Sequence, residues 1–183
     1  TTLYSEKILP QCWSKGNGYQ SVGLTHAVNT VSGVTNLYIY ENTVSLPKFE
    51  RNISDLAISF YAKPSNVNYA SILYVGYMTD PSDTSTFVSV ESIDVGFQQN
   101  VFLPHVVSFQ GVTIPDNAVV SFRKHDVIGI YIDDVVLDLA STCAAPVNLS
   151  SGRVTSSSVL LSWQENQEGI YKLYYKTDSQ SQY

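Results

Sequence analysis

The residues best placed to do chemistry are two adjacent carboxylates, Asp133 and Asp134, inside the apolar run 127–137. The run is short and rich in β-branched and aromatic residues, which predicts a strand buried on both faces. Neighbouring side chains of a strand point to opposite faces, so Asp133 is grouped with Tyr131 and Val135. Two opposed carboxylates cannot act as an acid–base pair. Because an isolated buried carboxylate is costly, each needs hydrogen bonds, a cation or a position at the rim of the sheet.

The other groups that could carry out catalysis show no catalytic arrangement. His26, His105 and His125 are scattered, and none has a partner at the spacing of a metal site or a catalytic triad. The sequence contains no G-x-S-x-G, H-E-x-x-H or phosphate-binding glycine motif. We therefore expect a protein that is not an enzyme.

A second set of candidate residues consists of tyrosines that alternate off the predicted core face of their strands. They are Tyr38, Tyr40, Tyr61 and Tyr74. Together they could form a platform on which sugar rings stack, with Trp13 and Tyr19, which flank the loop 16–18, lining one end of it. The alternative is that these tyrosines pack between two sheets.

Composition narrows the class of protein. The chain has 183 residues, a net charge of -6, only 14% charged residues and 13 tyrosines. Low charge with many aromatic and β-branched residues suggests an extracellular all-β protein. The sequence has no cluster of Lys and Arg, which argues against nucleic acid and anionic membrane surfaces as partners. No apolar run approaches the ~20 residues that span a bilayer, so we expect no direct membrane insertion.

The elements that must position these residues are short strands. Segments 35–40 and 56–62 alternate cleanly between apolar and other residues, which is the pattern of half-buried strands. Roughly ten such segments follow one another with turn residues between them, and no useful stretch has a helical period, which predicts a sandwich or barrel. The composition changes at 141–146, which we interpret as a linker. A second unit begins after the linker, and its sequence does not repeat that of the first unit.

Two terminal stretches of the first unit resemble a known type of domain. The segment 130–137 (IYIDDVVL), followed by Cys143, is similar to the closing strand of MAM-type domains and of galactose-binding-like jelly rolls. The segment 9–13 (LPQCW), with Glu6 before it, resembles their opening segment. The resemblance implies that residues 1–143 form a jelly-roll β-sandwich.

Two middle stretches resemble one variant of these domains. The segments 75–81 (VGYMTDP) and 121–124 (SFRK) look like the middle of modules found in secreted and surface proteins of Bacteroides-like bacteria. These include the adhesin modules attached to gingipain-type proteases. The resemblance covers roughly residues 3–143.

The same resemblance implies a structural calcium ion. An early-strand glutamate (Glu6), one of the closing-strand aspartates (Asp133 or Asp134) and backbone carbonyls from loops such as the one ending at Asn36 would hold it. Calcium takes about 6–8 oxygen ligands, which such a set begins to supply. The alternative is that one aspartate is hydrogen-bonded to turn amides while the other is solvated at the rim.

The second unit, residues 144–183, looks like a linker followed by the start of a fibronectin type III domain. The segments 147–149, 160–163 and 171–176 suit its first three strands. That fold needs about seven strands and about 100 residues, so this unit cannot complete it. We expect a chain cut from a longer multidomain protein.

The two cysteines, Cys12 and Cys143, lie near the two ends of the predicted first domain. Domain termini often lie close together, so a disulfide joining them is geometrically plausible. The alternative is a pair of unpaired buried thiols.

These observations predict an all-β protein, a jelly roll followed by a partial fibronectin type III-like sandwich. Its expected function is that of a non-catalytic, secreted or cell-surface bacterial adhesion module that binds a host or matrix ligand. One alternative is a carbohydrate-binding module of a larger glycan-degrading or surface protein. Another is a structural spacer that contacts other proteins.

Overall fold

The computed structural model describes residues 9–18, 22–26, 30–96, 100–126, 128–140 and 147–164. It divides the chain into two compact units, 1–140 and 141–183. The boundary predicted at residue 143 lies outside the described residues and stays a prediction. Within the described part, no helix is both long enough and apolar enough to span a membrane.

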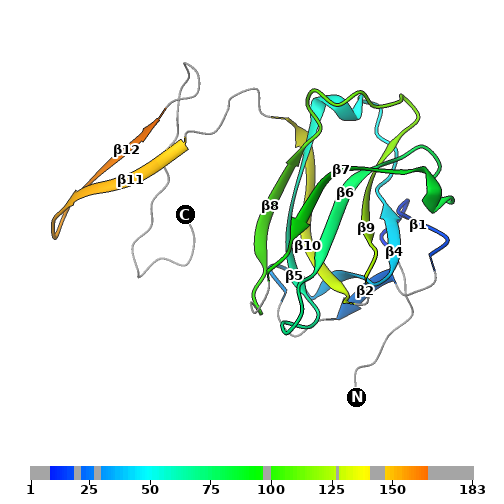
Figure 1. Cartoon of the computed structure of the whole chain (residues 1–183), viewed down its shortest axis with the longest axis horizontal. Helices are drawn as coiled ribbons and strands as arrows, with labels where there is room; N and C mark the ends of the chain where they lie inside the picture. Colours follow the sequence, from blue (N-terminus) through cyan, green and yellow to red (C-terminus); the bar gives the residue numbers. More distant parts are fainter. Residues whose placement is uncertain are drawn as a thin grey trace. The chain divides into compact units, whose positions relative to one another are not determined.

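The first unit is a sandwich of two five-stranded antiparallel sheets (Figure 1). Sheet A has the strand order β1-β4-β9-β6-β7, and sheet B has the order β2-β3-β10-β5-β8. Strands far apart in the sequence are therefore neighbours, as in β4 beside β9 and β3 beside β10. The prediction of an all-β jelly-roll β-sandwich is confirmed.

The strands of sheet A are β1 (Ser14–Lys15), β4 (Asn42–Ser45), β9 (Val119–Lys124), β6 (Ile72–Met78) and β7 (Phe87–Asp94). The strands of sheet B are β2 (Val22–His26), β3 (Thr35–Ile39), β10 (Ile130–Leu139), β5 (Leu56–Pro64) and β8 (Leu103–Ser108). The described helical elements are two 3₁₀ turns, η1 (Ile53–Asp55) and η2 (Thr84–Thr86). Each turn begins after a capping residue, Asn52 or Asp83, whose side chain accepts a backbone N–H two residues further on.

The core lies between the two sheets and follows from the alternation of the strands. Leu37 and Ile39 of β3 are buried, while Tyr38 between them is half-buried on the opposite face. The same pattern in β5 buries Phe60, whose ring meets the ring of Phe122 from sheet A edge to face, with the centroids 5.0 Å apart. These contacts join the two sheets into one apolar core.

A β-bulge in β10 interrupts this alternation. The pairing of β10 with β5 shifts between Asp133 and Val136, and Asp134 adopts a left-handed conformation with φ of 48°. As a result Asp133 shares the outer face with Tyr131, whereas Val135 packs against the core. The prediction that Asp133 and Val135 share a face is therefore wrong, because the bulge adds a residue and changes the parity of the strand.

Strand β6 approaches its neighbour β7 very closely at Gly76. A Cβ atom at this position would collide with the backbone carbonyl of Val88. The register of β6 and β7 also shifts between Val75 and Gly76. Gly76 therefore allows an irregular pairing that a larger residue would force apart.

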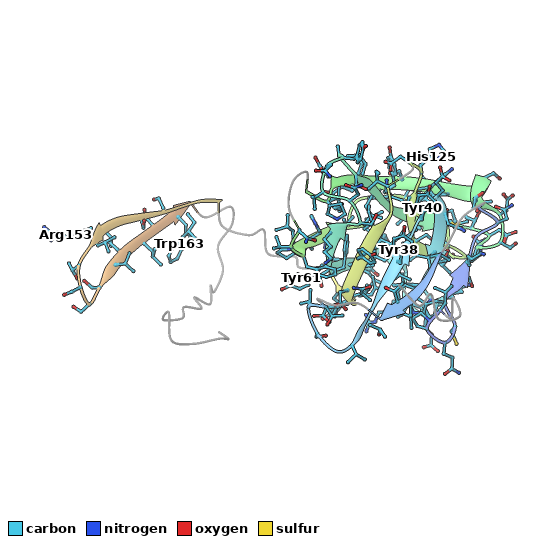
Figure 2. All side chains as sticks on the ribbon, turned by 90° about the horizontal axis from the view of Figure 1, so that it is seen from below. Tyr38, Tyr40, Tyr61, His125, Arg153 and Trp163 are labelled. Carbon is cyan, nitrogen blue, oxygen red and sulfur yellow. The ribbon has the colours of Figure 1, made fainter. Side chains whose placement is uncertain are left out.

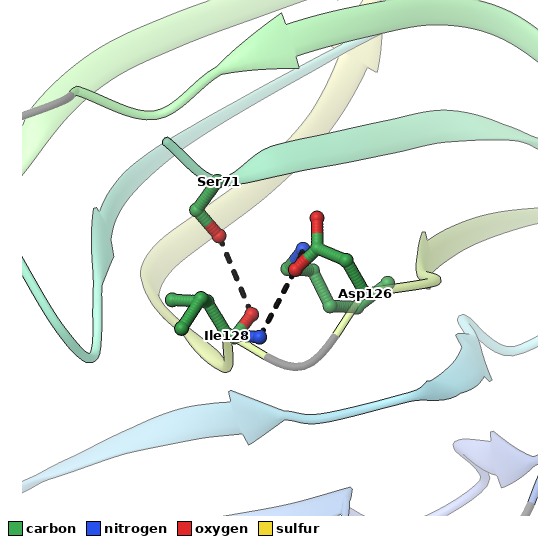
Figure 3. Close-up of polar contacts among 4 residues, drawn as sticks. Ser71, Asp126 and Ile128 are labelled. Atoms are coloured by element: carbon green, nitrogen blue, oxygen red, sulfur yellow. Dashed lines mark hydrogen bonds and ion pairs between the residues drawn. The ribbon is translucent and has the colours of Figure 1, made fainter. Parts of the chain in front are cut away.

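The loop between β9 and β10 closes one end of the sandwich with a charged pair. The side chain of Lys124 is fully buried, and its Nζ forms an ion pair with the Asp126 carboxylate. Asp126 Oδ1 also accepts the N–H of Ile128 at 3.0 Å, and the Ser71 hydroxyl donates to the Ile128 carbonyl at 3.3 Å (Figure 3). The carboxylate thus neutralises a buried ammonium group and fixes the turn into β10.

The described part of the second unit is a two-stranded hairpin of β11 (Val147–Val154) and β12 (Val159–Gln164). Leu149, Leu160 and Trp163 in this hairpin are exposed. An isolated two-stranded hairpin with exposed apolar side chains has little stability of its own. The assignment of this unit to a fibronectin type III-like module stays a prediction.

The packing of His105 predicts a pH dependence of stability. Its ring lies 5.5 Å from that of Phe60, its Nε2 is buried without a hydrogen-bond partner in the described part of the chain, and burial lowers its pKa. The unfolded chain binds a proton on this residue near pH 6.5, whereas the folded chain resists it. The free energy of unfolding should therefore be highest above that pH and fall as the pH drops below it.

Urea unfolding of wild type, His105→Leu and His125→Asn between pH 7.5 and 5.5 checks this. His105→Leu should flatten the loss of stability in this range, while His125→Asn, a substitution at an exposed histidine, should leave it in place. An equal slope for all three proteins would contradict the assignment.

Candidate functional site

The outer face of sheet A carries an open groove, which we call the Arg123 groove. One part has a volume of about 620 Å³ and an adjoining part about 370 Å³, and both are lined by Arg123 and His125. The first part is also lined by Asn17, Gly18, Glu41, Asn42, Thr43, Thr84 and Lys124. The second part is also lined by Tyr74, Phe87 and Ser89.

Register places the central residues of this groove side by side. Arg123 of β9 is paired with Thr43 of β4 on one side and with Tyr74 of β6 on the other. The Arg123 guanidinium lies over the ring of Phe87, 5.4 Å from its centroid. This contact holds the planar cation in place with its donors available to the groove.

A loop contact forms one side of the Arg123 groove. Asn17 Oδ1 accepts the Thr84 hydroxyl at 2.7 Å and the Thr84 N–H at 3.3 Å. The loop before β2 is thereby tied to the turn before β7. The groove combines aromatic rings with amide, hydroxyl and guanidinium groups, a mixture suited to a ligand with many hydroxyl groups and apolar ring faces.

The predicted tyrosines lie on two different sheets. Tyr38 and Tyr61 belong to sheet B, Tyr40 directly follows β3, and all three lie off the core, with Tyr61 36% exposed (Figure 2). The rings of Tyr38 and Tyr40 stack with centroids 6.5 Å apart. Tyr74 instead lines the Arg123 groove in sheet A. The single platform of four tyrosines is therefore wrong, although none of Tyr38, Tyr40 and Tyr61 packs between the sheets.

The Asp133 and Asp134 carboxylates fasten the loop before β3. Asp133, which is 8% exposed, accepts the N–H of Val31 at 2.7 Å and that of Asp134 at 2.9 Å. Asp134 accepts the Ser32 hydroxyl. This arrangement matches the alternative in which one aspartate binds turn amides and the other lies at the rim.

Asn36 offers an observation that bears on a metal ion. Its Oδ1 accepts the Thr25 hydroxyl at 2.7 Å, and its Nδ2 is buried without a hydrogen-bond partner in the described residues. The Thr25 hydroxyl can accept a hydrogen bond as well as donate one. If the Asn36 side-chain amide were rotated by 180°, its nitrogen would keep the contact with Thr25 and its oxygen would occupy the position that has no partner. Asn36 precedes Leu37 in β3, and Leu37 pairs with Ile132, which precedes Asp133 in β10.

These oxygen donors fit calcium better than a softer metal. Within the described ranges, no three His, Cys, Asp or Glu residues are grouped closely enough to hold a metal ion. Glu6, the remaining predicted ligand, lies outside the described residues. The calcium site stays a prediction with Asn36, Asp133 and Asp134 as its described part.

The remaining predicted residues are placed as follows. Trp13 precedes β1 of sheet A and packs against the core, whereas Tyr19 lies outside the described residues. Cys12 is exposed, with φ of 67°, and has a free thiol in the described part of the chain. Cys143 lies outside the described residues, so the disulfide stays a prediction.

Sequence reasoning missed Arg123 and Lys63 as candidate functional residues. Both are cations next to a buried apolar residue of their strand, Phe122 or Ala62. A charged residue that alternates with core residues in a strand is a signal that could have found them. Their neighbours on adjacent strands could not be identified without the register.

Comparison with solved structures supports the fold. The chain matches the K2 cleaved adhesin domain of Lys-gingipain with a TM-score of 0.52 and 13% identity, over 72% of this chain and 92% of that one. It matches the N-terminal CBM22-1-CBM22-2 tandem domain of Paenibacillus barcinonensis Xyn10C with a TM-score of 0.51 and 16% identity, over 81% of this chain and 47% of that one. This chain thus spans about half of the tandem.

A third similar structure is the CBM22-1 xylan-binding domain of the same Xyn10C, with a TM-score of 0.47 and 18% identity over 73% of this chain and 89% of that one. The sequence matches no family model and no curated protein. The two matches with TM-scores above 0.5 show a shared jelly-roll fold, and at these identities they show the fold alone.

The two hydrogen bonds of Asp133 predict a large contribution to stability. Asp133→Ala removes the acceptor of two backbone N–H groups and should lower the free energy of unfolding by about 2–4 kcal/mol. Asp138→Ala, at an exposed position of the same strand, should change it by less than about 0.5 kcal/mol. Urea unfolding measures both, and equal effects would contradict the assigned role of the Asp133 carboxylate.

Proposed function

We propose that the first unit is a non-catalytic module that binds glycans on behalf of a secreted or cell-surface adhesive protein. The observation that carries this proposal is the Arg123 groove, which combines an open shape with two aromatic rings and an anchored guanidinium group. The jelly-roll fold supports the proposal because it also occurs in an adhesin domain and in the CBM22 tandem. Fold alone does not fix a ligand, so the groove is the main support.

In this proposal the groove binds a sugar through two kinds of contact. The rings of Tyr74 and Phe87 would pack against the apolar face of a pyranose. Arg123, with its fixed donors, and Asn17 and Glu41 nearby would hydrogen-bond the ring hydroxyls. Such contacts would orient a ligand in the groove.

We include a structural calcium ion in the proposal. Asn36, Asp133 and Asp134, with Glu6 and loop carbonyls, would hold it beside the loop before β3. When bound, the ion would neutralise the clustered carboxylates and stabilise the native state by mass action. The partnerless Asn36 amide supports this part of the proposal.

A second candidate function is adhesion to another protein. Strand β8 is an edge strand of sheet B, and Val106 on it is 67% exposed. An uncovered edge strand with apolar side chains can accept a strand from a partner. This function would require no sugar in the Arg123 groove.

A glycan-array screen with and without calcium tests the main proposal. The wild-type protein should bind a defined set of oligosaccharides, and Tyr74→Ala should weaken that binding about tenfold because it removes a stacking ring. Arg123→Ala should have a similar effect. Tyr61→Ala, which removes an exposed tyrosine from the opposite sheet, is the matched control and should bind as wild type does.

Absence of binding to the whole array in both conditions would contradict the glycan proposal and favour the protein-binding candidate. Undiminished binding by both groove variants would place the sugar elsewhere on the molecule.

Calcium should raise the thermal stability of the protein. Calcium at about 100 times its dissociation constant adds about 2.7 kcal/mol, which raises Tm by roughly 10 °C for a domain of this size. Asp134→Ala should lower Tm and abolish the calcium response, whereas Asp138→Ala should keep it. Differential scanning calorimetry in calcium and in EDTA measures both, and a wild-type response in Asp134→Ala would exclude that residue as a ligand.

A further inference from the structure

The outer face of sheet B carries a row of side chains that the Arg123 groove does not use. Register pairs Tyr131 of β10 with Tyr38 of β3 on one side and with Lys63 of β5 on the other. Phe102, just before β8, lies against Lys63 and extends this set across three strands, which we call the Lys63 row. Neighbouring strands are about 4.8 Å apart, so the three strand positions alone extend over about 10 Å, the scale of a short oligosaccharide.

The cation of this row is held between aromatic rings. Lys63 Nζ lies 4.9 Å from the ring centroid of Phe102 and 5.6 Å from that of Tyr131. The ring of Tyr131 in turn lies 5.1 Å from that of Tyr38, tilted by 42°. Tyr38 and Tyr131 thus form one aromatic pair, and the Lys63 ammonium group lies between it and the ring of Phe102.

Lys63 has no polar partner among the residues that the structure describes. The residue is only 7% exposed, but its Nζ is not one of the buried polar atoms, so a ligand can reach it. Burial lowers the pKa of Lys63 by desolvation. The two ring faces offer no hydrogen-bond acceptor atom, so an anion reaching Nζ would gain a charge-assisted hydrogen bond.

Neighbouring carboxylates do not supply that anion. Asp133 lies in the next row, where it pairs with Tyr61. Its two carboxylate oxygens accept the N–H groups of Val31 and Asp134. Among the described residues, this face therefore presents a cation without an anionic partner beside aromatic rings.

We propose that the Lys63 row is a second binding site, which takes an acidic glycan by pairing Lys63 with a carboxylate or sulfate group and stacking the sugar ring on Tyr131 and Phe102. This site is independent of the Arg123 groove, which lies on the other sheet. A neutral sugar would stack on the rings but leave the ammonium group without a partner, so the charge on the ligand determines affinity.

Gly129 keeps the row in place. A Cβ atom at Gly129 would collide with the ring of Tyr38, so only glycine lets this ring lie over β10. Gly129→Ala should therefore displace an outer-face ring without changing the packing between the sheets. It provides a second variant that perturbs the row and keeps Lys63.

Isothermal titration with tri-galacturonate, its methyl ester and a heparin-derived tetrasaccharide tests the proposal. At least one acidic sugar should bind wild type, and the ester, which has the same ring without the charge, should bind at least about tenfold more weakly than the acid if the carboxylate is recognised. Binding of the heparin fragment alone would assign the site to sulfated sugars.

Variants separate this site from the groove. Lys63→Met should weaken the acidic ligand about tenfold or more, Lys63→Arg should retain it, and Gly129→Ala should weaken it while leaving Tm close to wild type. Lys48→Met, at an exposed lysine outside both sites, should leave it unchanged. Three results would overturn the proposal. Lys63→Met could bind the acidic ligand as tightly as wild type does, or neither acidic sugar could bind at all. The third is that tri-galacturonate and its methyl ester bind equally while the heparin fragment does not bind.

Discussion

The hydrogen bonds that Asp133 accepts at the β10 bulge are the constraint on which sheet B depends. Strand β10 is the central strand of that sheet, between β3 and β5. An extra residue in a central strand breaks the regular pairing, and the displaced N–H of Asp134 needs an acceptor. The Asp133 carboxylate supplies it and also fastens the loop before β3 through Val31. A polar side chain in an apolar strand therefore serves first to stabilise an irregularity.

Much of the fold could be predicted because alternation along a strand is a local property. Segments 35–40 and 56–62 indicated which residues face the core, and β3 and β5 confirm that assignment. The bulge could not be predicted, because an inserted residue leaves the composition of the strand unchanged. The prediction for Val135 failed for this reason.

The candidate sites were harder to predict because each is a cross-strand row. The Arg123 groove brings together Thr43, Tyr74 and Arg123. The Lys63 row likewise joins residues that are far apart in the sequence, namely Tyr38, Lys63 and Tyr131. Register between distant strands follows from the whole topology, so no local pattern groups such residues. The tyrosines were correctly placed off the core, yet their division between two sheets was visible only in the folded chain.

The two-layer architecture also affects how the module would act on a polymer. The outer faces of a sandwich point in opposite directions, with the core between them. Two ligand chains, one on each face, would be joined by a single small domain without competing for space. Such a domain behaves as a cross-linker, and within a network of glycans the second contact forms at a high effective concentration. A module with modest affinity on each face could in this way contribute to the mechanical cohesion of an extracellular matrix.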